Sequence, residues 1–182
     1  SPRRQAGRPL WDGTPRPGTR LLVWPEQGVG DEITYAGCVP DLLRTGQAVT
    51  LECDARLVPL FRHSFPEATV RAVTHDRRGR ERLSVPDYDV HLPIASLPRL
   101  YRRSLDAFPA HDGYLRPSPE VRDRWRRAVA ALGAGLTVGI AWRSGNMAGD
   151  RFNYFAPLEA WRPVLAVPGV TFVNLQYGTR PE

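Results

Sequence analysis

The chain has 182 residues, 42% of them hydrophobic, with 18 prolines and 16 glycines. This length suits one globular domain with part of a second, and the apolar content can supply a buried core. A run of about 18 apolar residues, which a membrane-spanning helix needs, does not occur, and the N-terminus lacks the apolar centre of a signal peptide. We therefore expect a cytoplasmic globular protein without a membrane span.

All 25 basic residues are arginines, which against 19 acidic residues gives a net charge of +6. Because arginine stays protonated at working pH, the chain offers neither a lysine base nor a lysine Schiff base. Positive charge can attract nucleic acid or phosphorylated ligands. The arginines are scattered along the chain rather than grouped in a stripe, so we do not expect nucleic acid as a partner.

The residue types that bind metals give no recognisable pattern. Cys38 and Cys53 lie within apolar segments and have no CxxC spacing, which favours buried free thiols over a disulfide or a metal site. The four histidines form no metal-binding pair, and neither a P-loop nor a GxSxG nucleophile elbow is present. We expect no metal and no cofactor.

The first periodic segment predicts a strand, a loop and a helix. Leu21–Trp24 is a short apolar run that ends at Pro25, and apolar or small residues then recur at helical spacing from Asp31 to Arg44. Asp31 stands where a helix N-cap is expected. In open α/β sheets, the loop between a strand and the next helix N-terminus is where anionic or sugar ligands bind. We place the candidate functional site on this loop.

Further strands and helices follow in alternation. Strands are predicted at Ala48–Cys53, Thr69–Val73 and Tyr88–Leu92. A short helix capped by Asp54 is predicted between the strands at Ala48–Cys53 and Thr69–Val73, and another helix at Leu97–Arg103 follows the strand at Tyr88–Leu92. The charged stretch Thr74–Val85 is expected to be a surface loop. The order of elements predicts a parallel sheet with right-handed crossovers.

A second unit opens in the same way as the first. A helix that starts at Ser118 ends at Gly133, and a buried-type strand at Leu136–Trp142 leads into a polar loop, a helix at Pro157–Val167 and a strand at Val170–Leu175. The sequence therefore predicts an α/β protein with a Rossmann-like parallel sheet and the start of a second Rossmann-like domain.

We expect three segments: a lead-in or linker at 1–19, an N-terminal domain at 20–133 and the beginning of a C-terminal domain at 134–182. In the lead-in, Trp11 either docks on the domain or remains a single exposed aromatic. Two strands and one helix cannot cover both faces of a parallel sheet, so the second domain looks truncated and the chain resembles a fragment of a longer protein. Its open sheet edge would suit a partner or a second copy of the chain.

Four segments together carry a family resemblance. They are Glu26–Asp31, Leu92–Pro98, Gly139–Gly145 and Val173–Gly178. In this order they resemble the glycosyltransferase region found behind tetratricopeptide repeats in many bacterial proteins. That region is similar to glycosyltransferase family 9, the heptosyltransferases, and more distantly to the family 41 protein O-glycosyltransferases. The resemblance covers the chain from Leu10 to Gly178, and no 34-residue helical repeat is visible in the chain itself.

The resemblance implies a GT-B fold, in which the first domain holds the acceptor and the second holds the nucleotide-sugar donor. It implies transfer of a sugar, without a metal, to a hydroxyl of a glycan or protein. Asp31 matches the aspartate proposed in heptosyltransferases as the base that deprotonates the acceptor hydroxyl. Around it we assign the loop and acceptor-side residues Glu26, Gln27, Gly28, Gly30, His91 and Ser96. The donor-phosphate residues are Arg143, Ser144, Asn146 and Arg151, whose cations and donors would offset charge on the leaving group.

Several features leave alternatives open. A helix N-terminus favours negative charge and so weakens a carboxylate as a base, and Asp31 could be an N-cap without a catalytic part. His91 could equally be a satisfied core or rim histidine. The family's loop lysine is absent, with Arg151 in its place, and the nucleotide-gripping loops would lie beyond Glu182, so we expect no transfer by this chain alone.

Two other functions remain. A non-catalytic module could bind a phosphorylated or nucleic-acid partner, with steep salt dependence. The second alternative function is that of a dinucleotide-binding oxidoreductase domain. Gly28-x-Gly30, followed about 20 residues later by Glu52, partly matches the sequence motif of such domains. The third glycine of that motif is missing.

Overall fold

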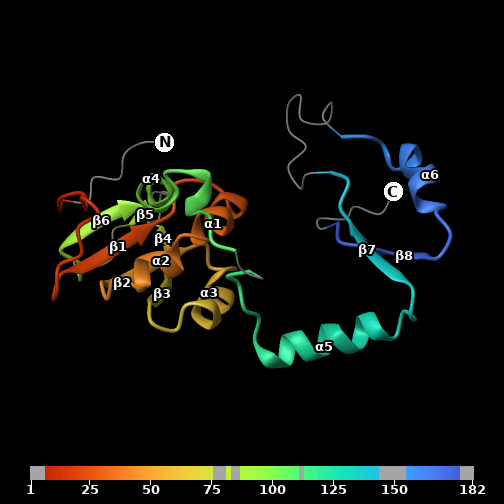
Figure 1. Cartoon of the computed structure of the whole chain (residues 1–182), viewed down its shortest axis with the longest axis horizontal. Coiled ribbons are helices and arrows are strands. Elements are labelled where there is room, and N and C mark those ends of the chain that lie inside the picture. Colours follow the sequence, from red (N-terminus) through yellow and green to blue (C-terminus); the bar gives the residue numbers. More distant parts are fainter. Residues whose placement is uncertain (1–6, 76–80, 83–86, 111–112, 144–154, 177–182) are drawn as a thin grey trace. The chain divides into compact units, whose positions relative to one another are not determined.

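The structure is a computed structural model that describes residues 7–75, 81–82, 87–110, 113–143 and 155–176 (Figure 1). Its contacts divide the chain into two units, residues 1–118 and 119–182, which we describe separately. Within the described residues, no helix is long and apolar enough to cross a membrane.

The first unit is built on a four-stranded parallel sheet. Its strands are β1 (Arg20–Trp24), β2 (Ala48–Cys53), β3 (Thr69–Ala72) and β6 (Val90–Pro93), in the order β3-β2-β1-β6. Every pairing between neighbours is parallel. The predicted Rossmann-like parallel sheet is confirmed. Between β3 and β6, a two-residue antiparallel pairing of β4 (Thr74–His75) with β5 (Glu81–Arg82) lies within the stretch that we expected to be a loop.

The helices of this unit are short. They are α1 (Val29–Ala36), α2 (Val39–Leu43), α3 (Val58–Ser64) and α4 (Leu97–Tyr101), with 3-10 turns at Ile94–Ser96 and Leu105–Ala107. The single helix expected from Asp31 to Arg44 is wrong, since it divides into α1 and α2. Pro40, in the first turn of α2, explains the break: in a continuous helix its ring would clash with the carbonyl four residues earlier, and it has no amide to donate.

The N-cap of α3 also differs from the expectation. Leu57, not Asp54, is the N-cap, and its amide donates to the Asp54 carbonyl at 2.9 Å. The Asp54 carboxylate instead accepts from the Arg56 amide at 2.9 Å. An aspartate side chain can bond to the amide two residues on in a turn as readily as it caps a helix, so the same sequence signal fits both.

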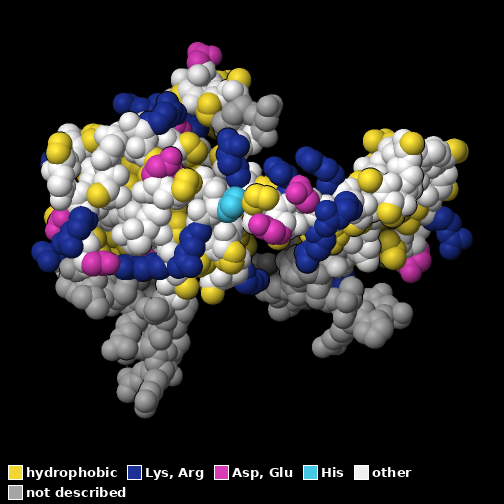
Figure 2. All heavy atoms as spheres, turned by 90° about the horizontal axis from the view of Figure 1, so that it is seen from below, with side chains coloured by type: hydrophobic (Ala, Val, Ile, Leu, Met, Phe, Trp, Pro, Cys, Tyr) yellow, Lys and Arg dark blue, Asp and Glu magenta, His cyan; other side chains and the backbone are white. Residues whose placement is uncertain are grey.

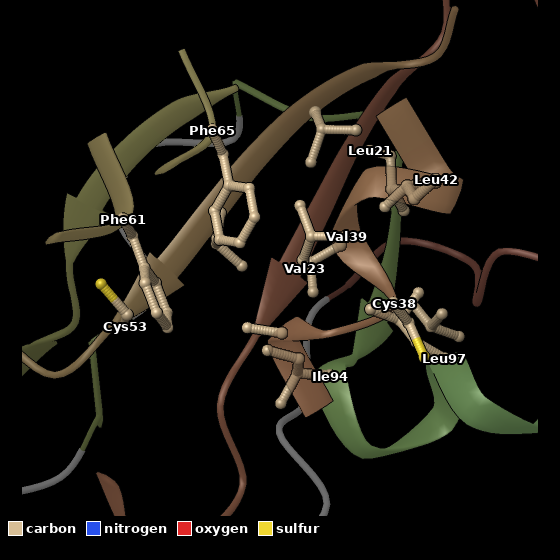
Figure 3. Close-up of a cluster of buried hydrophobic side chains, with 14 of the residues drawn as sticks. Leu21, Val23, Cys38, Val39, Leu42, Cys53, Phe61, Phe65, Ile94 and Leu97 are labelled. Carbon is tan, nitrogen blue, oxygen red and sulfur yellow. The ribbon is translucent and has the colours of Figure 1, made fainter. Parts of the chain in front are cut away.

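The main core lies between the sheet and the helices on one of its faces. Figure 3 shows side chains from β1, α2 and α3 directed into one space, among them Leu21, Val23, Val39 and Phe61. Cys38 and Cys53 are free and buried in this core, which confirms the expectation for both thiols. Desolvation, with the nearby Glu32 carboxylate as the next cause, raises the pKa of Cys53 to about 12. The thiol is therefore neutral at working pH.

The opposite face of the sheet carries a smaller cluster of Leu22, Trp24 and Tyr88. Beside it lies an ion-pair network. The Arg71 Nε donates to Oε1 of Glu52 at 3.0 Å, and the same guanidinium bonds both carboxylate oxygens of Asp87. Glu52 is only 1% exposed, so it is a buried charge that is neutralised by a partner.

The lead-in segment docks on this unit through Trp11. The Trp11 amide donates to the His91 carbonyl at 2.8 Å, and the indole Nε1 donates to the Thr14 carbonyl at 2.9 Å. The side chain joins the main core at 4% exposure. Of the two alternatives for this aromatic, docking is the correct one.

An exposed ion pair at the start of the sheet gives a prediction for pH dependence. A side-chain hydrogen bond from Arg20, together with the Arg20 amide, lowers the pKa of Asp89 to about 2. A lowered folded-state pKa stabilises the fold at neutral pH, and this contribution disappears as pH falls. We expect Asp89→Asn to lower the urea midpoint at pH 7, with the difference from wild type vanishing between about pH 4 and 2. A difference that stays constant down to pH 2 would contradict the ion-pair explanation.

The second unit contains α5 (Pro119–Ala130), β7 (Leu136–Ile140), α6 (Arg162–Leu165) and β8 (Val170–Asn174), with a 3-10 turn at Leu158–Trp161 before α6. The strands β7 and β8 pair in parallel from Leu136 with Val170 to Ile140 with Asn174. This confirms a second small parallel sheet. On α5, the apolar side chains of Val121, Trp125 and Val129 are exposed.

Candidate functional site

The candidate site is built on the loop that follows β1. The N-cap of α1 is Gly28, and the amides of Asp31 and Glu32 donate to its carbonyl at 3.0 and 3.1 Å. The expectation that Asp31 is the N-cap is therefore wrong, since it is the third residue of the helix. Glycine is also a favoured N-cap, and an acidic residue in the first turn gains from the helix dipole, so the sequence pattern fits both positions.

The carboxylate of Asp31 is available for chemistry. It makes no hydrogen bond and no ion pair with the residues that the structure describes. The side chain is partly buried. Its Oδ2 lies 3.9 Å from the place where a Cβ on Gly28 would be, which is an ordinary van der Waals distance. An unengaged carboxylate at this place can accept a proton from a bound hydroxyl.

Asp31 lies at a small hollow that has no room for a water molecule in this conformation. The hollow is lined by Glu26, Gln27, Asp31, Glu32, Tyr35, Ile94 and Ala95. The strands β1 and β6 are parallel neighbours, so the segments that follow them meet at the same edge of the sheet. The structure thus brings together three of the predicted site residues, Glu26, Gln27 and Asp31. Gly28 and Gly30 lie between Gln27 and Asp31 in the chain.

Glu32 is a member of this hollow that we did not select from the sequence. It is only 3% exposed, and its Oε2 accepts a hydrogen bond from the Asp54 amide at 2.9 Å. The side chain therefore joins the start of α1 to the loop after β2. The sequence did contain a signal for Glu32, since it is a charged residue on the helix face that packs on the sheet. A carboxylate is buried at such a place only when it has hydrogen-bond partners, so a structural role could have been inferred.

His91 does not reach the hollow. It pairs in register with Leu22, which places it on the sheet face opposite the main core, where it is 6% exposed. Its Nδ1 accepts from the Trp24 indole at 3.0 Å, and its ring lies edge-on to Tyr88. The structure places it as a satisfied core histidine, one of the two alternatives. Ser96 closes the 3-10 turn after β6 and is also not among the residues of the hollow.

The donor-side loop belongs to the second unit. Of its predicted residues, only Arg143 is described, while Ser144, Asn146 and Arg151 lie outside the described residues. The amides of Trp142 and Arg143 donate to Oε1 of Gln176 at 3.3 and 3.1 Å. Gln176 is buried at 8% exposure, and its backbone N–H donates to Oδ1 of Asn174 at 2.7 Å. Gln176 therefore fixes the first residues of the loop, a role that we did not assign from the sequence.

The two loops differ in charge. Of the described residues that line the β1–α1 hollow, Glu26, Asp31 and Glu32 are acidic and none is basic, so a phosphate finds no cation to bind there. Arg143, in contrast, begins the loop after β7. Among the described residues, no cluster of three or more histidine, cysteine or acidic side chains is arranged to hold a metal ion. On the surface drawn in Figure 2, arginine and acidic side chains are interspersed rather than gathered by sign.

Comparison with known proteins gives one relative. The chain is 35% identical to Protein FlbA of Caulobacter vibrioides over an alignment of 192 residues, which covers all of this chain and 32% of FlbA. No protein-family model matches the chain, and no solved structure matches it. The chain is thus similar to FlbA along its whole length and spans about a third of the length of that curated relative.

Proposed function

We propose that the chain forms the acceptor-side domain, and the beginning of the donor-side domain, of a GT-B glycosyltransferase. The enzyme transfers a sugar from a nucleotide donor to an acceptor hydroxyl without a metal. The observation that carries the proposal is the unengaged carboxylate of Asp31 at the carboxyl edge of a parallel α/β sheet. In this role Asp31 takes the hydroxyl proton while the acceptor oxygen attacks the anomeric carbon and the nucleoside diphosphate departs.

The acidic hollow favours this role over the alternatives. A dinucleotide-binding site uses its first strand–helix loop to hold a pyrophosphate, and the charged side chains that line this hollow are carboxylates, with no cation among the described lining residues to bind one. The same lining disfavours a phosphorylated or nucleic-acid ligand at this edge. An uncharged hydroxyl acceptor needs no cation and gains a proton acceptor. In this proposal the second unit, which contains Arg143, binds the anionic nucleotide-sugar donor.

The proposal is tested by titrating the full-length protein with UDP-, GDP-, CMP- and ADP-sugars, and in parallel with NAD, NADH and a DNA oligonucleotide. We expect one nucleotide sugar to bind. Arg143→Ala should weaken that binding about tenfold, since it removes a cation close to the diphosphate. Arg103→Ala, an exposed arginine of the first unit, serves as the control. Binding of nicotinamide cofactors or DNA, with none of the nucleotide sugars, would refute the glycosyltransferase.

A further inference from the structure

A second and larger cavity adjoins the hollow around Asp31. It has a volume of about 520 Å³ and lies between the second half of α1, α4 with the residue after it, and the described residues Phe108, Pro109 and Tyr114. Tyr35 lines both the hollow and the cavity, so the two spaces share a wall. The volume is in the range of cavities that bind small molecules.

Two polar side chains in the wall of the cavity, those of Arg102 and Tyr114, are already engaged. Arg102 donates to the Gly37 carbonyl at 3.0 Å and forms an ion pair with Asp41 at 2.6 Å, and its side chain is only 7% exposed. The Tyr114 hydroxyl donates to the Ile33 carbonyl at 2.5 Å. Arg102 is the only cation among the described residues of the wall, and since it is neutralised these residues present no net charge to an occupant.

The remaining wall is apolar. Pro98, Phe108 and Pro109 contribute ring surfaces, and Cys38 contributes a buried thiol. Burial raises the pKa of Cys38, so this thiol is neutral at working pH. By contrast, the Tyr35 hydroxyl makes no hydrogen bond with any residue that the structure describes. It is the polar group available where the cavity meets the hollow.

We propose that this cavity receives an uncharged aromatic or aliphatic group of the acceptor, while the reacting hydroxyl of that acceptor lies beside Asp31. The inference rests on the proposed function. A neutral apolar cavity complements a neutral apolar group, and burying one there is favourable in proportion to the area removed from water. A bare oligosaccharide would lose hydrogen bonds to water in the cavity, because Arg102 and Tyr114 are already bonded and Tyr35 offers a single hydroxyl in exchange.

Two sources could supply such a group, and paired probes distinguish them. Phenyl β-D-glucoside is compared with methyl β-D-glucoside, and the peptide acetyl-Gly-Ser-Phe-Gly-amide with acetyl-Gly-Ser-Gly-Gly-amide. Binding to the full-length protein is measured by calorimetry without any nucleotide sugar. We expect the ring-bearing member of at least one pair to bind about tenfold more tightly than its partner, and the preferred pair identifies the source.

Variants locate the binding. Phe108→Glu places a charge in the neutral wall and should remove the preference for the ring-bearing probe. Leu105→Glu, at a neighbouring side chain that is 87% exposed and not part of the wall, should retain it. Tyr35→Phe, which keeps the ring and removes the available hydroxyl, should weaken binding severalfold. Because Tyr35→Phe removes only one oxygen atom, it still tests the cavity if the Phe108→Glu variant does not fold.

Equal affinity within both pairs, no binding of any probe, or an unchanged preference in Phe108→Glu together with unchanged affinity in Tyr35→Phe would overturn the cavity assignment. The outcome is separable from that of the proposed function. Ring preference in a protein that binds no nucleotide sugar leaves the cavity assigned and refutes the transferase. Sugar transfer to methyl β-D-glucoside as fast as to phenyl β-D-glucoside would support the transferase and refute the cavity assignment.

Discussion

Asp31→Asn is expected to reduce sugar transfer by the full-length protein by about 10²–10⁴-fold, the range for loss of a general base. The amide has the same shape as the carboxylate but cannot take the proton of the acceptor hydroxyl at working pH. The carboxylate makes no hydrogen bond or ion pair with the described residues, so the substitution breaks none among them. Transfer is measured from the release of nucleoside diphosphate at saturating donor and acceptor.

The control for this prediction is Asp106→Asn. Asp106 is an exposed aspartate of the same unit that lies outside the hollow, and its substitution should leave the rate unchanged. Donor binding should be the same in both variants, since Asp31 lies on the acceptor side. Full transfer by Asp31→Asn would withdraw the base assignment. Loss of donor binding together with transfer would instead mean that Asp31 supports the fold or the donor site.

Trp11→Ala is expected to lower the free energy of unfolding by about 3–5 kcal/mol, the usual cost of removing a large aromatic side chain from a core. The indole is 4% exposed and is packed with residues of the sheet and helices. Its Nε1 bond to the Thr14 carbonyl is lost as well. Urea denaturation followed by circular dichroism measures the change.

Trp125→Ala is the matched control, because it makes the same substitution on an exposed face of α5, where the side chain is 57% exposed. It should change the free energy by no more than about 0.5 kcal/mol. If the two substitutions have equal effects, the lead-in does not dock as described. A large effect of Trp125→Ala alone would mean that its apolar face is covered in the full-length protein.

The elements of the first unit were predictable because each strand is a local apolar run between turn-forming residues. Leu21–Trp24 and Ala48–Cys53 can be recognised in this way without knowledge of their neighbours. The break between α1 and α2 was also in principle predictable, since Pro40 forbids the continuous helix that the apolar spacing suggested. Helix ends were less certain, because Gly28 and Asp31 are both acceptable near a helix N-terminus.

The sequence by itself determined the parallel α/β architecture and the place of Asp31 after the first strand, because both depend on residues close together in the chain. Only the tertiary structure decided which distant residues join it. The pairing of β1 with β6 brings Ile94 and Ala95 to the hollow, and the register of the same pair turns His91 to the opposite face. The burial of Glu32 and the docking of Trp11 depend likewise on partners far away in sequence, Asp54 and the His91 backbone. Such contacts form only when the chain is folded, so no local pattern specifies them.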